Sequence, residues 1–216
     1  MNITLTIPTS LSEITLGQYK KYLEIQTSEI DERSLQAKMI EIFCNAPLEY
    51  VMQLKYSDTQ EISSVLEEMF KEKPDLVQRF KLGNKEYGFH PNLEDLSLGE
   101  YIDLDTYIGD WQNMERAMNV LYRPIIAKLR EKYEIEKYST ELKEEALNIP
   151  MDAVLSSIFF LWNLGMELSQ SMMKYLEGEQ NLDLMQFLTS ELNGDGIPAY
   201  MRSLKETLED LNISPN

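Results

Sequence analysis

The sequence predicts a mainly α-helical fold with a small antiparallel sheet, and three observations support this fold class. Apolar side chains recur every three or four residues through most of the 216-residue chain, as they do on one face of a helix. Residues 78–90 contain two short alternating segments around a Gly-Asn pair, which is typical of a β-hairpin. A third alternating segment precedes Pro8 at the N-terminus.

The chain length predicts a single domain over residues 1–216. This domain is either undivided or built from two lobes, residues 1–92 with the small sheet and residues 93–216 with helices. The apolar content of 43% and the aromatic content of 10% are sufficient for a hydrophobic core. We therefore expect the chain to fold.

The N-terminal lobe is predicted to contain a strand, three helices and the hairpin. Ile3, Leu5 and Ile7 alternate with threonines, which indicates a short, half-buried strand that ends at Pro8. The spacing of apolar residues then predicts helices over residues 15–27, 32–44 and 57–71. In the hairpin, the pair at residues 83–84 can supply the positive φ angles of the turn.

A nine-residue motif occurs twice in the chain. Residues 11–19 (LSEITLGQY) and residues 93–101 (LEDLSLGEY) match in chemical type at every position except the second. Each copy follows a proline and contains a capping box, with Thr15 and Gln18 in one and Ser97 and Glu100 in the other. We interpret the likeness as a common local way to start a helix, and a pseudo-repeat is the alternative. We also expect the N-terminal strand to pair with the hairpin in a three-stranded sheet.

The C-terminal lobe is predicted to be helical. Helices are expected over residues 97–108, 111–123, 125–133, 140–147, 152–176, 182–192 and 198–211, with a loop at residues 193–196. Pro124 should kink or divide the helical stretch that contains it, because it lacks a backbone donor and clashes with the preceding turn. Residues 152–176 are apolar most of the way around the helix, which predicts the central helix of the core.

The chain is strongly acidic, with a formal net charge of −17 and a pI of about 4.5. A negatively charged protein repels phosphate backbones, which argues against nucleic-acid binding as the main activity. We interpret the acidity as a solvated surface that keeps the protein from associating. A charged face matched to a basic partner is the alternative.

Other features favour an intracellular protein that does not span a membrane. Cys44 is the only cysteine, so no intrachain disulfide can form, and its apolar neighbours predict a buried structural thiol. The N-terminus has neither the basic region nor the apolar core of a signal peptide. The most apolar segment, residues 153–166, is shorter than the roughly 18 residues of a membrane span, so we expect a core helix there.

The sequence predicts no catalytic, cofactor-binding or metal-ligating residue. His90 is the only histidine, which removes most schemes based on imidazole, and we expect it to have a structural or capping role. The densest group of carboxylates comprises Glu100, Asp103, Asp105 and Asp110. It begins like a calcium loop but lacks the glycine at the sixth position and the glutamate at the twelfth. We therefore expect a solvated acidic face there.

Two segments resemble a known group of viral proteins. They are residues 7–19 (IPTSLSEITLGQY) and the stretch from residues 98–105 (LGEYIDLD) through residues 121–125 (LYRPI). They resemble small helical proteins encoded among the virion genes of tailed bacteriophages, notably the crAss-like phages of gut bacteria. The likeness covers the N-terminal two-thirds of the chain and includes no catalytic motif.

This resemblance implies a non-enzymatic cargo or accessory protein of the virion. Cargo proteins of crAss-like phages are held inside the particle near the portal or tail and are delivered with the genome. The implied partners are other virion proteins, namely the portal, the tail or other cargo, and the implied arrangement is several copies in a symmetric assembly. The implied location is the virion, and the host cytoplasm during assembly.

Two alternatives to the virion role are retained. A tail-assembly chaperone that is absent from the mature particle fits the same genomic setting. A carboxylate-dependent hydrolase is the second alternative, because a catalytic pair of carboxylates is defined in space and not by sequence spacing.

Overall fold

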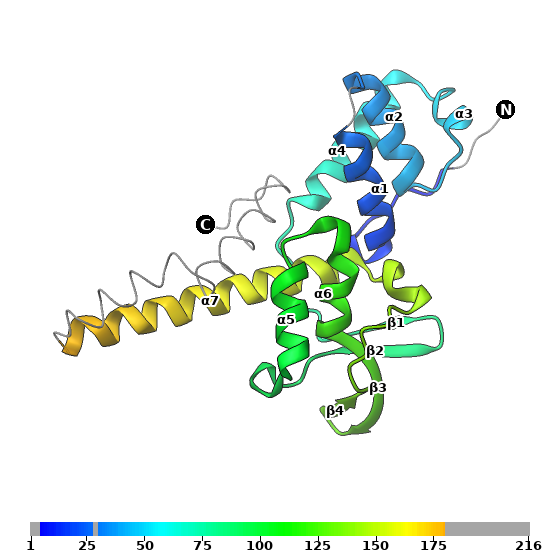
Figure 1. Ribbon diagram of the computed structural model, residues 1–216. Helices are drawn as coiled ribbons and strands as arrows, with labels where there is room; N and C mark the ends of the chain where they lie inside the picture. Colours follow the sequence, from blue (N-terminus) through cyan, green and yellow to red (C-terminus); the bar gives the residue numbers. More distant parts are fainter. Residues whose placement is uncertain (1–4, 28–29, 180–216) are drawn as a thin grey trace.

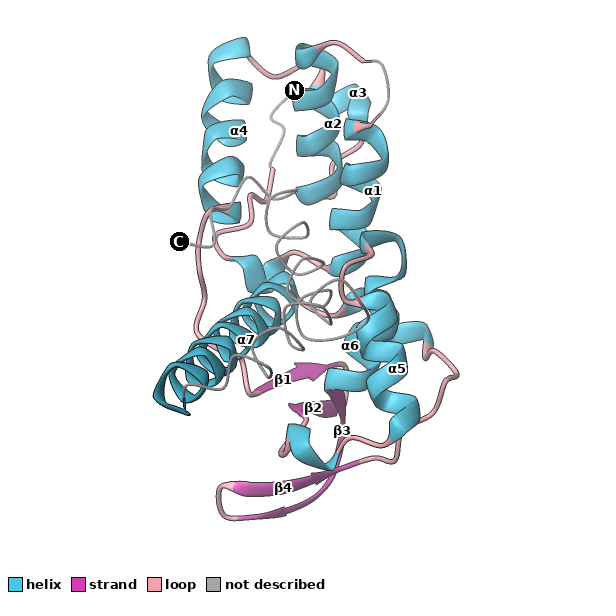
Figure 2. Ribbon diagram, turned by 60° about the vertical axis from the view of Figure 1, so that its left-hand side comes forward, coloured by secondary structure: helices cyan, strands magenta, loops and turns pink. Residues whose placement is uncertain are grey.

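The computed structural model describes residues 5–27 and 30–179 of the chain. Within these ranges the protein contains seven α-helices and one four-stranded antiparallel sheet, which confirms the predicted fold class. Four N-terminal helices lie at one end of the molecule and the sheet at the other, with the start of the longest helix between them (Figures 1 and 2). The predicted helices over residues 182–192 and 198–211, and the loop between them, lie outside the described residues.

The four N-terminal helices are α1 (Leu16–Gln26), α2 (Glu32–Phe43), α3 (Leu48–Val51) and α4 (Tyr56–Phe70). Three of them confirm predicted helices, whereas α3 is a single turn that the sequence pattern did not predict. The capping box of α1 is present, with the Gln18 backbone N–H donating to the Thr15 hydroxyl oxygen. Aromatic rings fill the space between these helices. The ring centres of Tyr19 and Phe43 each lie 5.2 Å from the ring centre of Phe70. Cys44 is buried, as predicted.

The sheet consists of β1 (Arg79–Leu82), β2 (Lys85–Phe89), β3 (Tyr122–Leu129) and β4 (Lys132–Ile135), in that order. Strands β1 and β2 form the predicted hairpin, and Gly83 has a φ of +55° in its turn, whereas Asn84 has no positive φ. Strand β2 pairs with β3 across the predicted lobe boundary at residue 92. One hydrophobic core includes side chains from both sides of that boundary.

Two of the predictions about the sheet are wrong. Residues 5–7 form no strand, so the third strand is β3 and not the N-terminal segment. Residues 125–133, predicted as a helix, form most of the β3–β4 hairpin. Pro124 disfavours helical backbone at Arg123, and residues 122–124 pair with β2. The β-branched Ile125 and Ile126 suit the continuation of this strand, which pairs with β4. Arg130 takes a left-handed φ of 58° in the turn.

Two helices pack together beside the sheet. Helix α5 (Leu98–Tyr107) has the second capping box, with Ser97 and Glu100, and matches its predicted range. A 3₁₀ helix (Trp111–Asn113) leads into α6 (Met114–Leu121), which ends two residues earlier than predicted because the chain then enters β3. The predicted helix over residues 140–147 is instead a short 3₁₀ helix (Glu144–Asn148).

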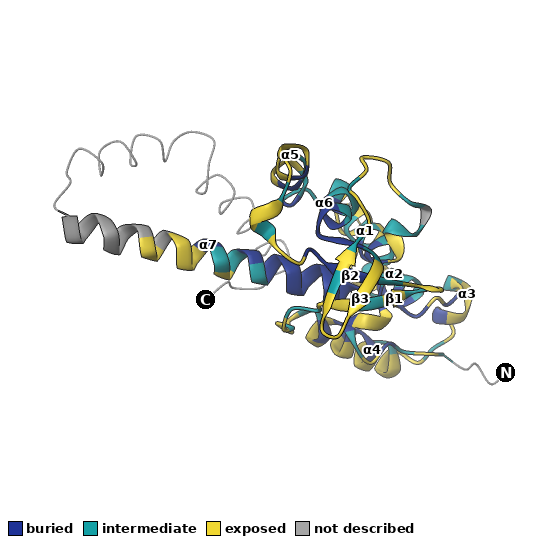
Figure 3. Ribbon diagram, turned by 90° about the horizontal axis from the view of Figure 1, so that it is seen from below, coloured by how far each residue is buried: buried dark blue, intermediate teal, exposed yellow. Residues whose placement is uncertain are grey.

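The longest helix, α7 (Met151–Glu179), confirms the predicted core helix. Its first turns are buried between the N-terminal helices and the sheet, and residues 166–168, 170 and 171 are exposed as it extends outward (Figure 3). The Tyr122 hydroxyl of β3 lies 2.8 Å from the carbonyl oxygen of Val77 and 3.3 Å from that of Ala153. The Val77 backbone N–H donates to the Ser156 hydroxyl oxygen. These contacts join the start of α7 to the sheet.

The first part of α7 is also long and apolar enough, by composition alone, to cross a membrane. Residues Met151–Leu168 have a mean hydropathy of 1.2. Within the protein, 56% of this segment is buried. Such burial is typical of a core helix in a globular domain.

We expect Gly88→Ala to destabilise the sheet. A Cβ atom at Gly88 would lie 2.4 Å from the nearest ring carbon of Tyr133, so the ring would have to move. The Tyr133 hydroxyl, which donates to the Phe89 carbonyl over 2.7 Å, would then lose its acceptor. The free energy of unfolding, measured by urea denaturation, should fall by about 1–3 kcal/mol. Tyr133→Phe is the control that removes only the hydrogen bond, and unchanged stability of Gly88→Ala would contradict this placement of Tyr133.

Candidate functional site

A buried ion pair joins α5 to the sheet. Glu100 Oε1 lies 2.7 Å from Arg123 Nη2, and the two side chains are only 8% and 7% exposed. The same carboxylate completes the capping box, since its Oε2 atom accepts from the Ser97 backbone N–H over 2.8 Å. The prediction of a solvated acidic face is therefore wrong for Glu100. Its burial was not visible in the sequence because its partner, Arg123, lies on a different element.

The other carboxylates of this group have separate environments. Asp103 accepts a hydrogen bond from the Tyr138 hydroxyl, and the ring of Tyr138 lies 5.9 Å from the guanidinium carbon of Arg123. Asp110 caps the 3₁₀ helix that follows α5 by accepting from the backbone N–H of Gln112. Asp105 is exposed. The four carboxylates that the sequence places together are thus divided: Glu100 is in a buried ion pair, Asp103 and Asp110 accept separate hydrogen bonds, and Asp105 is exposed.

The single histidine lies against this ion pair. His90 Nε2 is 3.9 Å from Glu100 Oε1, and His90 Nδ1 accepts from the Asn92 backbone N–H over 3.4 Å. The His90 backbone N–H donates to the carbonyl of Leu121 at the end of α6. The side chain is 8% exposed, so this position suits the predicted structural role.

The pKa values of His90 and Glu100 are both lower than usual, which favours a neutral histidine and an ionised glutamate. Burial lowers the pKa of His90, and the positive charge of Arg123 lowers it further. Burial acts to raise the pKa of Glu100, but hydrogen bonds with Ser97 and the charge of Arg123 hold it below its usual value. Near neutral pH, His90 is therefore neutral, Glu100 is ionised and Arg123 is cationic. The ion pair between Glu100 and Arg123 holds α5 against β3.

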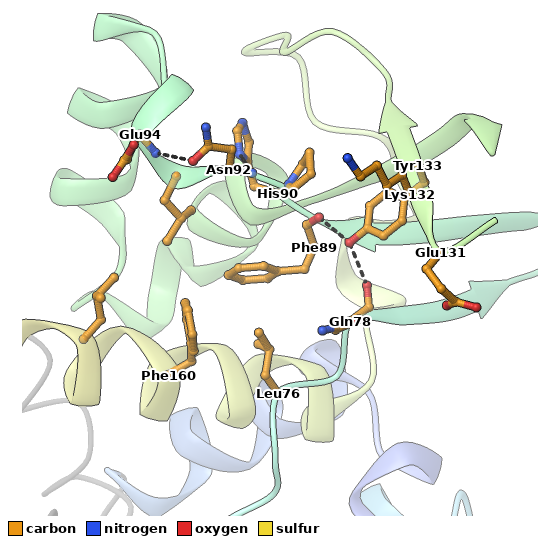
Figure 4. A pocket seen from close by; sticks show the side chains of 13 residues that line it. Leu76, Gln78, Phe89, His90, Asn92, Glu94, Glu131, Lys132, Tyr133 and Phe160 are labelled. Atoms are coloured by element: carbon orange, nitrogen blue, oxygen red, sulfur yellow. Dashed lines mark hydrogen bonds between the residues drawn. The ribbon is translucent and has the colours of Figure 1, made fainter. Parts of the chain in front are cut away.

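A groove lies beside these residues, between the sheet and α7 (Figure 4). Its volume is about 690 Å³, and its apolar lining includes Phe89 from β2 and Phe160 from α7. Polar groups surround it, among them Asn92, Glu94 and Lys132. The groove is open and mixed in chemistry, and it borders the 3₁₀ helix that precedes α5.

The outer face of α5 exposes three large apolar side chains. Leu98, Tyr101 and Ile102 are 75%, 52% and 51% exposed, and the spacing of three and four residues places them on one side of the helix. The opposite side carries Glu100 and Leu104, which are buried. We call Leu98, Tyr101 and Ile102 the α5 face. The sequence contained a signal for it, because α5 has more apolar residues than one buried side can use.

The surroundings of the α5 face are acidic. Glu94, Asp95 and Asp105 are exposed, and no lysine or arginine occurs between residues 86 and 115. Arg116, on α6, lies with its guanidinium 5.4 Å from the ring centre of Tyr107, near the C-terminal end of α5. Three apolar anchors in an acidic setting are therefore the most distinctive exposed feature of this region.

We expect Glu100→Gln to destabilise the protein by about 3–5 kcal/mol, because Arg123 would remain buried without a counter-charge. The capping box should survive, since Gln18 performs the same function in α1. Urea denaturation measures the change. The double variant Glu100→Gln/Arg123→Met should recover part of the loss. Wild-type stability of the single variant would contradict the pairing.

We also expect the stability to depend on the protonation of His90. Because the pKa of His90 is lower in the folded protein than in the unfolded chain, the unfolded chain binds the proton first as the pH falls. The stabilisation from neutral His90 is therefore complete above the unfolded pKa of about 6.5 and decreases below it, by at most about 1.4 kcal/mol per pH unit. Denaturation of the wild type and of His90→Gln between pH 7.5 and pH 5 isolates this effect as the difference between them. Identical pH profiles would show that His90 has no such effect.

Comparison with known proteins identifies no relative. No protein-family model matches the chain, and no curated protein or solved structure matches it.

Proposed function

We propose that this protein is a non-enzymatic component of a tailed-phage virion, a cargo or accessory protein that acts through contacts with other proteins near the portal or tail. The virion setting is supported by the resemblance of residues 7–19 and 98–125 to crAss-like phage proteins. Action through protein contacts is supported by one structural observation, the α5 face, with Leu98 75% exposed.

An exposed apolar group of this kind favours association with another protein. Single exposed apolar side chains are ordinary on protein surfaces, but three neighbours on one helix face form a continuous patch. Burying a large aliphatic or aromatic side chain contributes about 1.5–3 kcal/mol. Leu98, Tyr101 and Ile102 together can therefore supply several kcal/mol to a complex.

The ion pair beneath α5 prepares the face for binding. Because Glu100 is fixed by both Ser97 and Arg123, the helix is held in place before any partner arrives. A rigid surface loses less conformational entropy when it binds than a flexible one does. The acidic surroundings add selectivity, since they repel acidic partners and attract basic ones.

The alternative of a carboxylate-dependent hydrolase requires two close carboxyl groups, at least one of them with a raised pKa. Glu100 does not meet this requirement, because its pKa is lowered and its carboxylate is already paired with Arg123. A tail-assembly chaperone would use the same kind of surface. The two protein-binding roles differ in whether the protein is present in the finished particle.

We expect mass spectrometry of particles purified from the encoding virus to detect this chain. In virus that carries Leu98→Glu, the number of copies per particle should fall at least tenfold, because a charge in the apolar contact weakens binding. Leu129→Glu is the matched control, since Leu129 lies on β3 away from α5 and is 77% exposed. A chain that accumulates in infected cells but is absent from wild-type particles would support the chaperone instead.

A further inference from the structure

The two copies of the nine-residue motif differ in what covers them. In the first copy, Leu16 and Tyr19 are 0% and 4% exposed. At the equivalent positions of the second copy, Leu98 and Tyr101 are 75% and 52% exposed. The local structure is nevertheless the same, with a 3₁₀ turn, a capping box and a helix in both places.

Residues 147–151, which lead from the 3₁₀ helix Glu144–Asn148 into α7, lie against Leu16 and Gly17 of the first copy. Tyr19 is buried by other elements, with its ring against Phe70 and Trp111. The Leu16 backbone N–H donates to the carbonyl of Ile149, and the Met151 N–H donates to the carbonyl of Ile14, both over 2.9 Å. The two segments run antiparallel, with Thr15 opposite Pro150. This is recognition by strand-like pairing, in which backbone hydrogen bonds fix the segment and apolar side chains pack beside it.

Glycine in the motif permits this close approach. A Cβ atom on Gly17 would lie 3.1 Å from the carbonyl oxygen of Leu147 and 3.2 Å from its Cβ. The equivalent Gly99 has nothing within 4 Å of such an atom. Among the described residues, the Leu98 N–H and the Leu96 carbonyl, which correspond to the paired groups of the first copy, have no backbone partner. The second copy therefore offers the same surface without its cover.

We infer that the second copy of the motif binds an extended, apolar segment with basic flanks from a partner protein, in the way that residues 147–151 bind the first copy. This inference rests on the proposed function and adds the mode of binding and the chemistry of the partner. The segment places apolar side chains on Leu98, accepts a hydrogen bond from the Leu98 N–H and donates one to the Leu96 carbonyl.

Charge identifies the partner as basic. Glu94, Asp95 and Asp105 are exposed around the second copy, and lysine or arginine beside the apolar segment would pair with them. The net charge of −17 disfavours a second copy of this chain as the occupant, because two such chains repel each other. In the first copy the position equivalent to Ile102 is Lys20, which pairs instead with Glu115 inside the chain.

A synthetic peptide tests the inference on the full chain. The peptide contains the sequence of residues 147–151, Leu-Asn-Ile-Pro-Met, with two lysines on each side. Titration followed by NMR should shift the backbone amide signals of residues 96–102, with that of Leu98 moving as it becomes hydrogen-bonded. A peptide with glutamates in place of the lysines should bind at least about tenfold more weakly, because it meets an acidic surface.

Two glycine variants separate binding from stability. Gly99→Ala should raise the stability of the protein, since alanine favours a helix and its methyl group meets nothing. The same variant should weaken peptide binding about fivefold or more, because the methyl group occupies the path of the segment. Gly17→Ala is the matched control: it should be less stable than Gly99→Ala and should bind the peptide like the wild type.

Blocking one hydrogen bond tests the strand-like mode. N-methylation of the peptide amide that corresponds to Met151 removes the donor to the Leu96 carbonyl, and it should weaken binding about fivefold or more. Equal binding of the methylated and unmethylated peptides would overturn the strand-like mode.

If Leu98→Glu depletes the protein from particles but the lysine peptide does not bind, the proposed function stands and the inferred mode fails. If the peptide binds at residues 96–102 but Leu98→Glu leaves the particle content unchanged, the inferred surface is correct and its role in the virion fails. Self-association that Leu98→Glu abolishes would identify a second copy as the occupant and overturn the basic partner.

Discussion

Burial of the first turns of α7 is the constraint on which the rest of the fold depends. Met151, Val154, Leu155 and Ile158 are fully buried, and each such side chain contributes about 1.5–3 kcal/mol to stability. The segment that leads into the helix must therefore lie along α1, where it pairs with Thr15. On the opposite side, the Tyr122 hydroxyl contacts the backbone at Ala153, so the sheet is fastened to the same turns.

The position of α7 also explains why the two motif copies differ in exposure. The chain has one segment that leads into α7, and the first copy uses it. Helix α5 is stabilised by other means, through the pairing of Glu100 with Arg123 beneath it. Glutamate suits this position better than the glutamine of α1, because only a carboxylate both completes the capping box and neutralises a buried guanidinium. The outer surface of α5 is consequently left open.

Buried and exposed carboxylates have different effects in this protein. Inside, Glu100 is ionised and paired, and it contributes to the attachment of α5. At the surface, Glu94, Asp95 and Asp105 are exposed near the α5 face, and we propose that they select a partner by charge. Part of the net charge of −17 therefore borders an exposed apolar surface.

Features that depend on residues close together in the chain were predictable without a structure. Both capping boxes, α1, α2, α4 and the β1–β2 hairpin follow from side chains a few positions apart, which meet in any fold. Tertiary structure decided the rest. Residues 125–133 form most of the β3–β4 hairpin, which continues a strand whose first residues, 122–124, pair with the distant β2. The burial of Glu100 and the exposure of Leu98 depend on which distant segments lie against α5, and two similar local motifs therefore have opposite surroundings.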